Sequence, residues 1–73
     1  MIIAKFKAGG RAYAVYKYGY ADYFVSAPNC HNVFNFETDE EAIRYFAEKC
    51  GVPVNQVTNF NKGENKNEYR NNL

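Results

Sequence analysis

IIAKFKAGGRAYAVYKYGYADYFVSA, residues 2–27, contains three β-strand patterns that are separated by glycine turns. The Gly9-Gly10 pair predicts a two-residue hairpin turn, because both central positions of that turn need positive φ. Such a turn fixes the antiparallel register, so Ala8 is expected to face Arg11. We therefore predict a β-meander whose strands cover residues 2–7, 11–18 and 20–27.

The alternation of side chains gives this meander two different faces. We expect the apolar face to carry Ile2, Ala4, Phe6, Tyr13 and Val15. The opposite face is aromatic and basic, with Lys5, Lys7, Ala12, Ala14, Tyr16 and Tyr18, and with Ile3 opposite Tyr16 at its end. A bulge at Gly19 would decide whether the set with Tyr23 or the set with Phe24 joins the apolar face.

The second half of the chain predicts one amphipathic helix. Residues 28–32 have the composition of a loop, and residues 33–36 alternate like a short fourth strand. Thr38 and Glu41 form a capping-box pattern, in which the Thr38 hydroxyl accepts from the Glu41 amide and the Glu41 carboxylate accepts from the Thr38 amide. The helix should run from about residue 39 to residue 50 and end at Gly51. Its apolar stripe has helical spacing and comprises Ala42, Ile43, Phe46, Ala47 and Cys50.

These elements define the expected fold class and domain. We predict an α+β fold, in which a small antiparallel β-meander of three or four strands carries one amphipathic helix on one face, with a possible extra short helix or edge strand. Residues 1–60 should form the single compact domain. Residues 61–73 have almost no apolar content, and we expect a flexible polar tail.

Residues 46–60, FAEKCGVPVNQVTNF, allow two interpretations. The segment resembles a helix-turn-helix unit, with Ala47, Gly51 and Val57 at the small, turn and buried positions. The resemblance implies a second helix that presents side chains able to bind base edges, namely Asn55, Gln56, Thr58 and Asn59. The alternative is a loop followed by a closing edge strand, a pattern that is common in compact α+β domains.

Composition and charge limit the class of protein. The net charge is +1, but residues 1–36 hold four Lys or Arg against one Asp, whereas residues 37–51 hold five Asp or Glu against two Lys or Arg. Such a dipolar chain can steer an anionic partner to one side. No apolar run is long enough to span a membrane and no signal peptide is recognisable. We expect a cytoplasmic protein, in which Cys30 and Cys50 are free thiols.

The candidate groups for catalysis and metal binding are few. His31 is the only histidine, and Cys50 is its only conceivable partner for a Cys-His dyad. Cysteine and histidine also lack the paired spacing of structural zinc sites. We therefore expect no enzyme activity, no metal and no cofactor.

Binding is the remaining class of function. We expect a protein partner to dock on the aromatic and basic face, because exposed aromatic side chains with Arg and Lys are typical of interaction hot spots. The candidate residues are Lys5, Lys7, Arg11, Tyr16, Lys17, Tyr18, Tyr20 and Phe24.

Two alternatives to a protein partner stay open. Nucleic acid could bind, either by stacking on these rings or through the helix-turn-helix pattern. The face could instead be the interface of a homodimer. The chain is rich in Asn, Tyr, Phe and Lys, residues that A/T-rich genes encode, which suggests a small phage or mobile-element protein that inhibits a host enzyme or defence complex.

Overall fold

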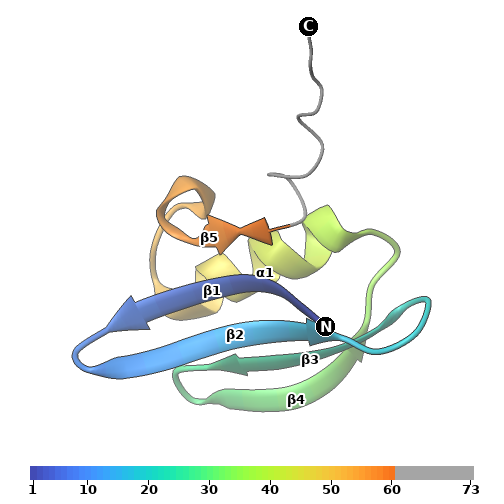
Figure 1. The fold of residues 1–73 in the computed structure, drawn as a ribbon, viewed down its shortest axis with the longest axis horizontal. Helices are drawn as coiled ribbons and strands as arrows, with labels where there is room; N and C mark the ends of the chain where they lie inside the picture. Colours follow the sequence, from blue (N-terminus) through green and yellow to red (C-terminus); the bar gives the residue numbers. More distant parts are fainter. Residues whose placement is uncertain (61–73) are drawn as a thin grey trace, which may run out of the picture.

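The computed structural model describes residues 1–60 and shows a five-stranded antiparallel sheet with one helix packed against it (Figure 1). The strands are β1 (Ile2–Ala8), β2 (Arg11–Lys17), β3 (Asp22–Ala27), β4 (Cys30–Asn35) and β5 (Thr58–Asn59), and their order in the sheet is β4-β3-β2-β1-β5. Helix α1 spans Asp39–Cys50, and a 3-10 helix, η1, spans Val54–Gln56. The expected α+β fold is confirmed. The tail expected over residues 61–73 lies outside the described residues.

The first hairpin has the register that its glycine turn predicts. Ala8 pairs with Arg11, Phe6 with Tyr13 and Ala4 with Val15. Gly9 and Gly10 have φ of 60° and 79°, a region that glycine enters without steric cost. The turn residues alone therefore determine which side chains of β1 and β2 lie opposite one another.

A β-bulge at Ile3 changes the start of β1. Ile2, and not Ile3, pairs with Tyr16, because the register shifts between Ile2 and Ala4. The extra residue turns Ile3 into the core, where it is fully buried, and leaves Ile2 on the other face with 38% of its surface exposed. The expected placement of these two isoleucines was wrong.

The hairpin of β3 and β4 is tighter than the sequence suggested. Only Pro28 and Asn29 form the turn, and β4 starts at Cys30, so residues 30–32 are strand and not loop. Asn29 has φ of 60°, which asparagine tolerates better than most residues, and the proline before it favours the turn. His31 therefore belongs to a strand whose register against β3 is fixed.

Helix α1 covers one face of the sheet and closes the core. It begins after Thr38, whose hydroxyl accepts a hydrogen bond from the Glu41 amide at 3.1 Å, as expected. The Glu41 carboxylate, however, accepts from the Glu37 amide at 3.0 Å and not from Thr38. The buried stripe of α1 packs on the buried side chains of the sheet, which are Ile3, Ala4, Val15, Tyr23, Val25, Ala27 and Cys30.

The segment after α1 forms no second α-helix. Gly51, with φ of 77°, ends α1, and the three residues of η1 are followed by β5. β5 pairs with Ala4 and Lys5 of β1, so it is the outer strand on that side and covers part of the β1 edge. The helix-turn-helix prediction is wrong, and the alternative of a loop with a closing edge strand is confirmed.

Candidate binding surface

The face of the sheet opposite α1, which we call the open face, carries a continuous apolar row. Ile2 pairs with Tyr16, Tyr16 with Phe24, and Phe24 with Val33. Because directly opposed residues of antiparallel strands project to the same side, these four side chains cross β1, β2, β3 and β4 in one line. We call this set the apolar row.

The apolar row is exposed at its two ends and half-buried in its middle. Val33 has 65% of its surface exposed, and Tyr16 and Phe24 are half-buried. The Tyr16 and Phe24 rings pack against each other with centroids 6.1 Å apart and planes tilted by 44°. No element within residues 1–60 lies over the row, so aromatic and aliphatic side chains face solvent from a regular sheet.

The rows beside the apolar row differ in charge. On one side, Lys5 and Lys7 are exposed and pair with Ala14 and Ala12. On the other side, Asp22 pairs with Asn35, whose side-chain amide donates to the Asp22 carboxylate. The open face therefore carries an apolar row with basic side chains on one side of it.

The structure brings only part of the expected site together. Lys5, Lys7, Tyr16 and Phe24 lie on the open face. The exposed Tyr18 and Tyr20 lie outside the strands, between β2 and β3, and Tyr20 has 94% of its surface accessible.

The other expected site residues lie elsewhere. Lys17 and Arg11 belong to the opposite alternation of β2 and do not share the open face. Asn55 and Gln56 belong to η1, whereas Thr58 and Asn59 belong to β5, so no single helix presents these four residues.

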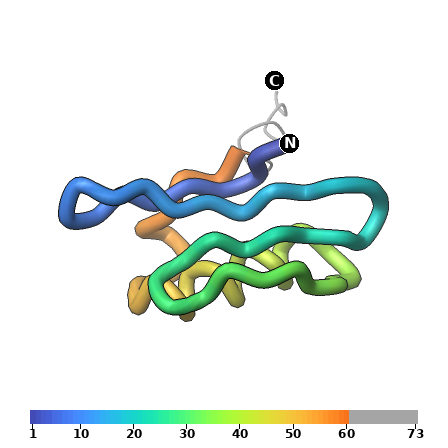
Figure 2. The backbone as a smooth tube through the Cα atoms, turned by 90° about the horizontal axis from the view of Figure 1, so that it is seen from below, coloured from blue at the N-terminus to red at the C-terminus, as the bar shows by residue number. Residues whose placement is uncertain are grey.

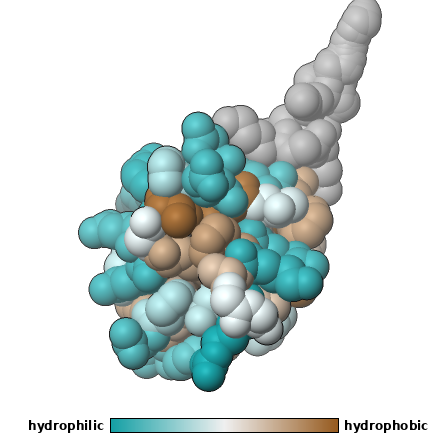
Figure 3. All heavy atoms as spheres, turned by 90° about the vertical axis from the view of Figure 1, so that its left-hand side faces the viewer, coloured by the Kyte–Doolittle hydropathy of each residue, from teal (hydrophilic) through white to brown (hydrophobic). Residues whose placement is uncertain are grey.

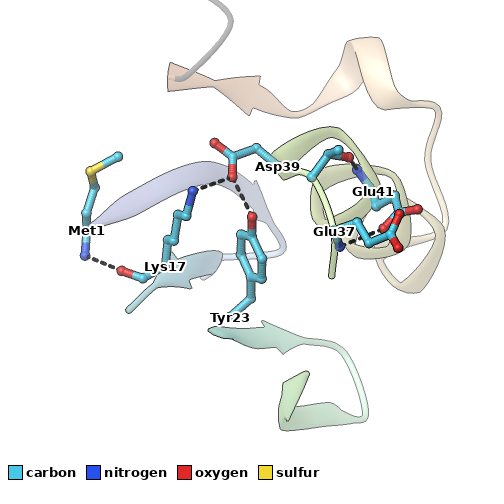
Figure 4. Close-up of polar contacts among 7 residues, drawn as sticks. Met1, Lys17, Tyr23, Glu37, Asp39 and Glu41 are labelled. Atoms are coloured by element: carbon cyan, nitrogen blue, oxygen red, sulfur yellow. Dashed lines mark hydrogen bonds and ion pairs between the residues drawn. The ribbon is translucent and has the colours of Figure 1, made fainter. Parts of the chain in front are cut away.

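Lys17 is held on the covered side by a polar contact with the start of α1 (Figure 4). Its ammonium group lies 3.0 Å from the Asp39 carboxylate, and the same oxygen accepts a 2.5 Å hydrogen bond from the Tyr23 hydroxyl. Burial and this hydrogen bond raise the pKa of Tyr23. Burial alone would raise the pKa of Asp39, but the hydrogen bonds from Tyr23 and Lys17 and the Lys17 charge lower it below its usual range. This contact connects the first residue of α1 to β2 and β3.

Figure 2 shows that the β1–β2 turn and the β3–β4 turn diverge at one end of the sheet. An open cleft lies between these turns. β2 pairs with β3 only from Ala14 to Lys17, so the first residues of β2 have no neighbour on that side. The cleft has a volume of about 650 Å³ and is lined by Arg11, Ala12, Tyr13, Ser26, Pro28, Asn29 and His31. Viewed from the end of the molecule that holds these turns, an apolar area is surrounded by hydrophilic side chains (Figure 3).

The chemistry of this cleft is polar. The Ser26 hydroxyl lies 3.2 Å from Nδ1 of His31. No carboxylate is among the lining residues, so the imidazole lacks the orienting acid of a catalytic triad there. Arg11 and His31 give the cleft hydrogen-bond donors suited to an anion.

The two cysteines are unbridged and lie on the covered side of the sheet. Cys30 is buried, with its sulfur 4.0 Å from the Tyr45 hydroxyl. Burial raises the pKa of the Cys50 thiol, which disfavours the reactive thiolate. His31 belongs to the open face, so the sheet separates it from Cys50. Within residues 1–60, no cluster of three or more His, Cys, Asp or Glu side chains is placed to hold a metal ion.

Two members of the apolar row, Ile2 and Val33, were not among the expected site residues. Nothing local in the sequence marks the bulge that exposes Ile2. Val33 was recognisable in principle, because a two-residue turn at Pro28 and Asn29 pairs Ala27 with Cys30 and hence Phe24 with Val33.

Comparison with models of protein families, with curated proteins and with solved structures finds no match. Among the described residues, no helix combines the length and the apolar character needed to cross a membrane.

Proposed function

We propose that this chain is a small, non-catalytic binding protein that docks on a protein partner through its open face. The observation that carries this proposal is the apolar row, which crosses four strands and is covered by no element within residues 1–60. A contiguous exposed apolar patch of this kind is typical of interaction sites.

The row has the properties of an interface anchor. Tyr16 and Phe24 lie on adjacent strands in the middle of the sheet, so their backbones are fixed before any partner arrives. Aromatic side chains on a rigid support lose little conformational entropy on binding, and such residues dominate the energy of protein interfaces. Val33 and Ile2 extend the contact at both ends of the row.

The margins of the open face define the chemistry of the partner. Lys5 and Lys7 are exposed beside the row, and Lys17 is already paired with Asp39. We therefore expect a partner that has an apolar centre and carboxylates opposite Lys5 and Lys7. Charges at such a margin act mainly on the association rate and on specificity.

Single-stranded nucleic acid is the second candidate partner. The observation that favours it is the position of Tyr16 and Phe24 on adjacent strands, with Lys5 in the neighbouring row. Unpaired bases stack on aromatic side chains of sheets in this way, and Lys binds the phosphates. Binding through a helix-turn-helix is not proposed, because within residues 1–60 α1 is followed only by the three residues of η1 and not by a second α-helix.

The composition of the chain suggests where to look for the protein partner. The residues of A/T-rich genes are typical of small phage proteins, and we propose a cytoplasmic host enzyme or defence complex as the target. A binder that covers part of an enzyme surface inhibits it without chemistry of its own.

Capture by matched variants tests the proposal. The tagged wild-type chain, the double variant Tyr16→Ser/Phe24→Ser and the control Tyr20→Ser are each immobilised and exposed to nuclease-treated bacterial lysate. Tyr20 is an exposed aromatic residue outside the row, so the control removes a ring without changing the open face. We expect the wild type and the control to retain the same protein and the double variant to lose it. Capture of that protein by the folded double variant would contradict the proposal.

Two further measurements separate the alternatives. Binding to nucleic acid would weaken steeply as salt rises, because bound counterions are released, whereas binding to a mainly apolar protein surface would change little. Sedimentation of the double variant should give the wild-type mass. A lower mass would instead make the apolar row an interface between copies of this chain.

A further inference from the structure

The two edges of the sheet differ in whether another strand pairs with them. β4 is the outer strand on one side, and within residues 1–60 nothing pairs with its free edge. On the other side, β5 pairs with Ala4 and Lys5 of β1. Figure 1 shows β5 beside β1, whereas β4 forms the opposite border of the sheet. An unpaired strand edge is a template for another strand.

The turn at Pro28 and Asn29 determines which backbone groups of β4 are available. In a two-residue hairpin, the residues that flank the turn, Ala27 and Cys30, exchange hydrogen bonds with each other. Alternate residues of β4 therefore bond to β3, and the residues between them direct N–H and C=O outward. The outward residues are His31, Val33 and Asn35.

β4 lacks the features with which natural proteins protect an edge strand. Its sequence, CHNVFN, contains no Lys, no acidic residue and no Pro, and it pairs with β3 without a bulge. β1 has such protection, because it carries Lys5 and Lys7 and a bulge at Ile3. Tyr45 of helix α1 contacts Phe34 and Cys30 on the covered side of β4, but within residues 1–60 no element pairs with the outer backbone edge of β4.

We propose that the free edge of β4 pairs with β4 of a second copy of this chain. The proposed register is antiparallel and centred on Val33, so that Val33 faces its own counterpart and His31 faces Asn35 of the other copy. This register uses the outward backbone groups of all three residues in both copies. A second copy is the occupant that we choose, because two identical strands that pair antiparallel are related by a two-fold axis and no Lys, Arg, Asp or Glu side chain in β4 repels its counterpart.

The proposed pairing extends the open face. A two-fold axis perpendicular to the sheet keeps both open faces on the same side. Val33 is at the end of the apolar row, so the two rows would join into one that crosses both sheets. The pairing itself depends on the β4 backbone and does not require the open face to bind any partner.

Proline scanning of the two edges tests this inference. In Val33→Pro, the substitution removes an outward N–H that makes no bond to β3, so the hairpin keeps its ladder. Lys7→Pro is the matched control, because the alternation from the Gly9-Gly10 turn also directs the Lys7 amide outward, at the β1 edge. Val33→Lys retains the N–H but places two like charges opposite each other at the centre of the proposed pairing. This variant tests the inference if the proline variant does not fold.

Sedimentation equilibrium over a micromolar to millimolar range gives the result. We expect twice the mass of one chain for the wild type, for Lys7→Pro and for Tyr16→Ser/Phe24→Ser, and the mass of one chain for Val33→Pro and Val33→Lys. We also expect slow hydrogen exchange of the Val33 amide in the wild type, and fast exchange in Val33→Lys. A monomeric wild type, or a dimer that persists in both Val33 variants, would overturn the inference. If Tyr16→Ser/Phe24→Ser keeps the dimer mass but no longer captures the partner protein, the β4 edge and the proposed docking site are separate surfaces.

Discussion

Tyr23 and Phe24 are neighbours in β3, but their side chains lie on opposite faces of the sheet, one covered by α1 and one not. Tyr23 is 1% exposed, packs under α1 and donates its hydroxyl proton to Asp39. Phe24 is half-buried, contacts Tyr16, and faces solvent beside the exposed Val33. The covered face holds the apolar surface that stabilises the fold. The open face holds apolar surface that α1 does not cover, and this uncovered apolar surface is the reason why we propose the open face as the binding site.

Removing one large ring from each face should separate their roles most clearly. Phe46, on the stripe of α1, is fully buried, so we expect Phe46→Ala to lower the free energy of unfolding by roughly 3–5 kcal/mol. Phe24→Ala on the open face should cost about 1 kcal/mol, the scale of one cross-strand aromatic pair. Urea unfolding of both variants measures the difference. Equal losses would mean that the open face is part of the core.

The bulge in β1 gives the same comparison within two adjacent residues. Ile3 is fully buried and Ile2 is 38% exposed. We expect Ile3→Ala to cost about 2–5 kcal/mol, because it leaves a cavity in the core. Ile2→Ala should cost less than about 1 kcal/mol, as surface substitutions do. The reverse order of the two unfolding midpoints would show that β1 pairs with β2 without the bulge.

The polar contact of Asp39 with Lys17 and Tyr23 joins α1 to the sheet. We expect its loss to lower the free energy of unfolding more than the loss of a carboxylate on the open face. Asp39→Ala leaves Lys17 and the Tyr23 hydroxyl without their acceptor, and we expect a loss of about 1–3 kcal/mol. Asp22→Ala, on the open face, is the matched control and should stay within about 0.5 kcal/mol.

Acid should weaken the same contact. The folded-state pKa of Asp39 is lowered, so its contribution is present above the ordinary carboxyl pKa and is lost as pH falls through the folded-state value. Unfolding free energies of the wild type and Asp39→Asn should therefore converge on acidification. A difference that stays constant from neutral to acid pH would argue against this role of Asp39.

The cap of α1 should have a smaller effect than the core substitutions. Thr38→Ala removes the acceptor for the Glu41 amide and should cost about 1 kcal/mol without altering the open face. Thermal unfolding measures the loss, and capture of the partner should be unchanged. An unaltered melting temperature would mean that another group satisfies this amide.

Local chemistry made much of the covered face predictable. The glycine turn determines the β1–β2 register, and the Thr38 cap with Gly51 determines both ends of α1. Each signal lies within a few residues of its effect, so one sequence is enough to recognise it.

The parts that sequence did not predict depend on contacts between distant segments. Ile3 belongs to the buried cluster that also contains Phe46 of α1, and the periodicity of β1 cannot show that. Lys17 lies on the covered side because it alternates with Tyr16 in β2, but its pairing with Asp39, far along the chain, could not be seen from the sequence. The open face could be outlined from alternation, but its apolar row became visible only when β4 was in register.

The most direct test of the division between the two faces is an NMR titration of the isotope-labelled chain with the protein that it captures. The account predicts that side-chain signals of Tyr16, Phe24 and Val33 shift or broaden, whereas those of Arg44 and Glu48 on the exposed side of α1 do not. Perturbation of Arg44 and Glu48 with unchanged signals from the apolar row would contradict it, because the partner would then bind on the helix side of the molecule.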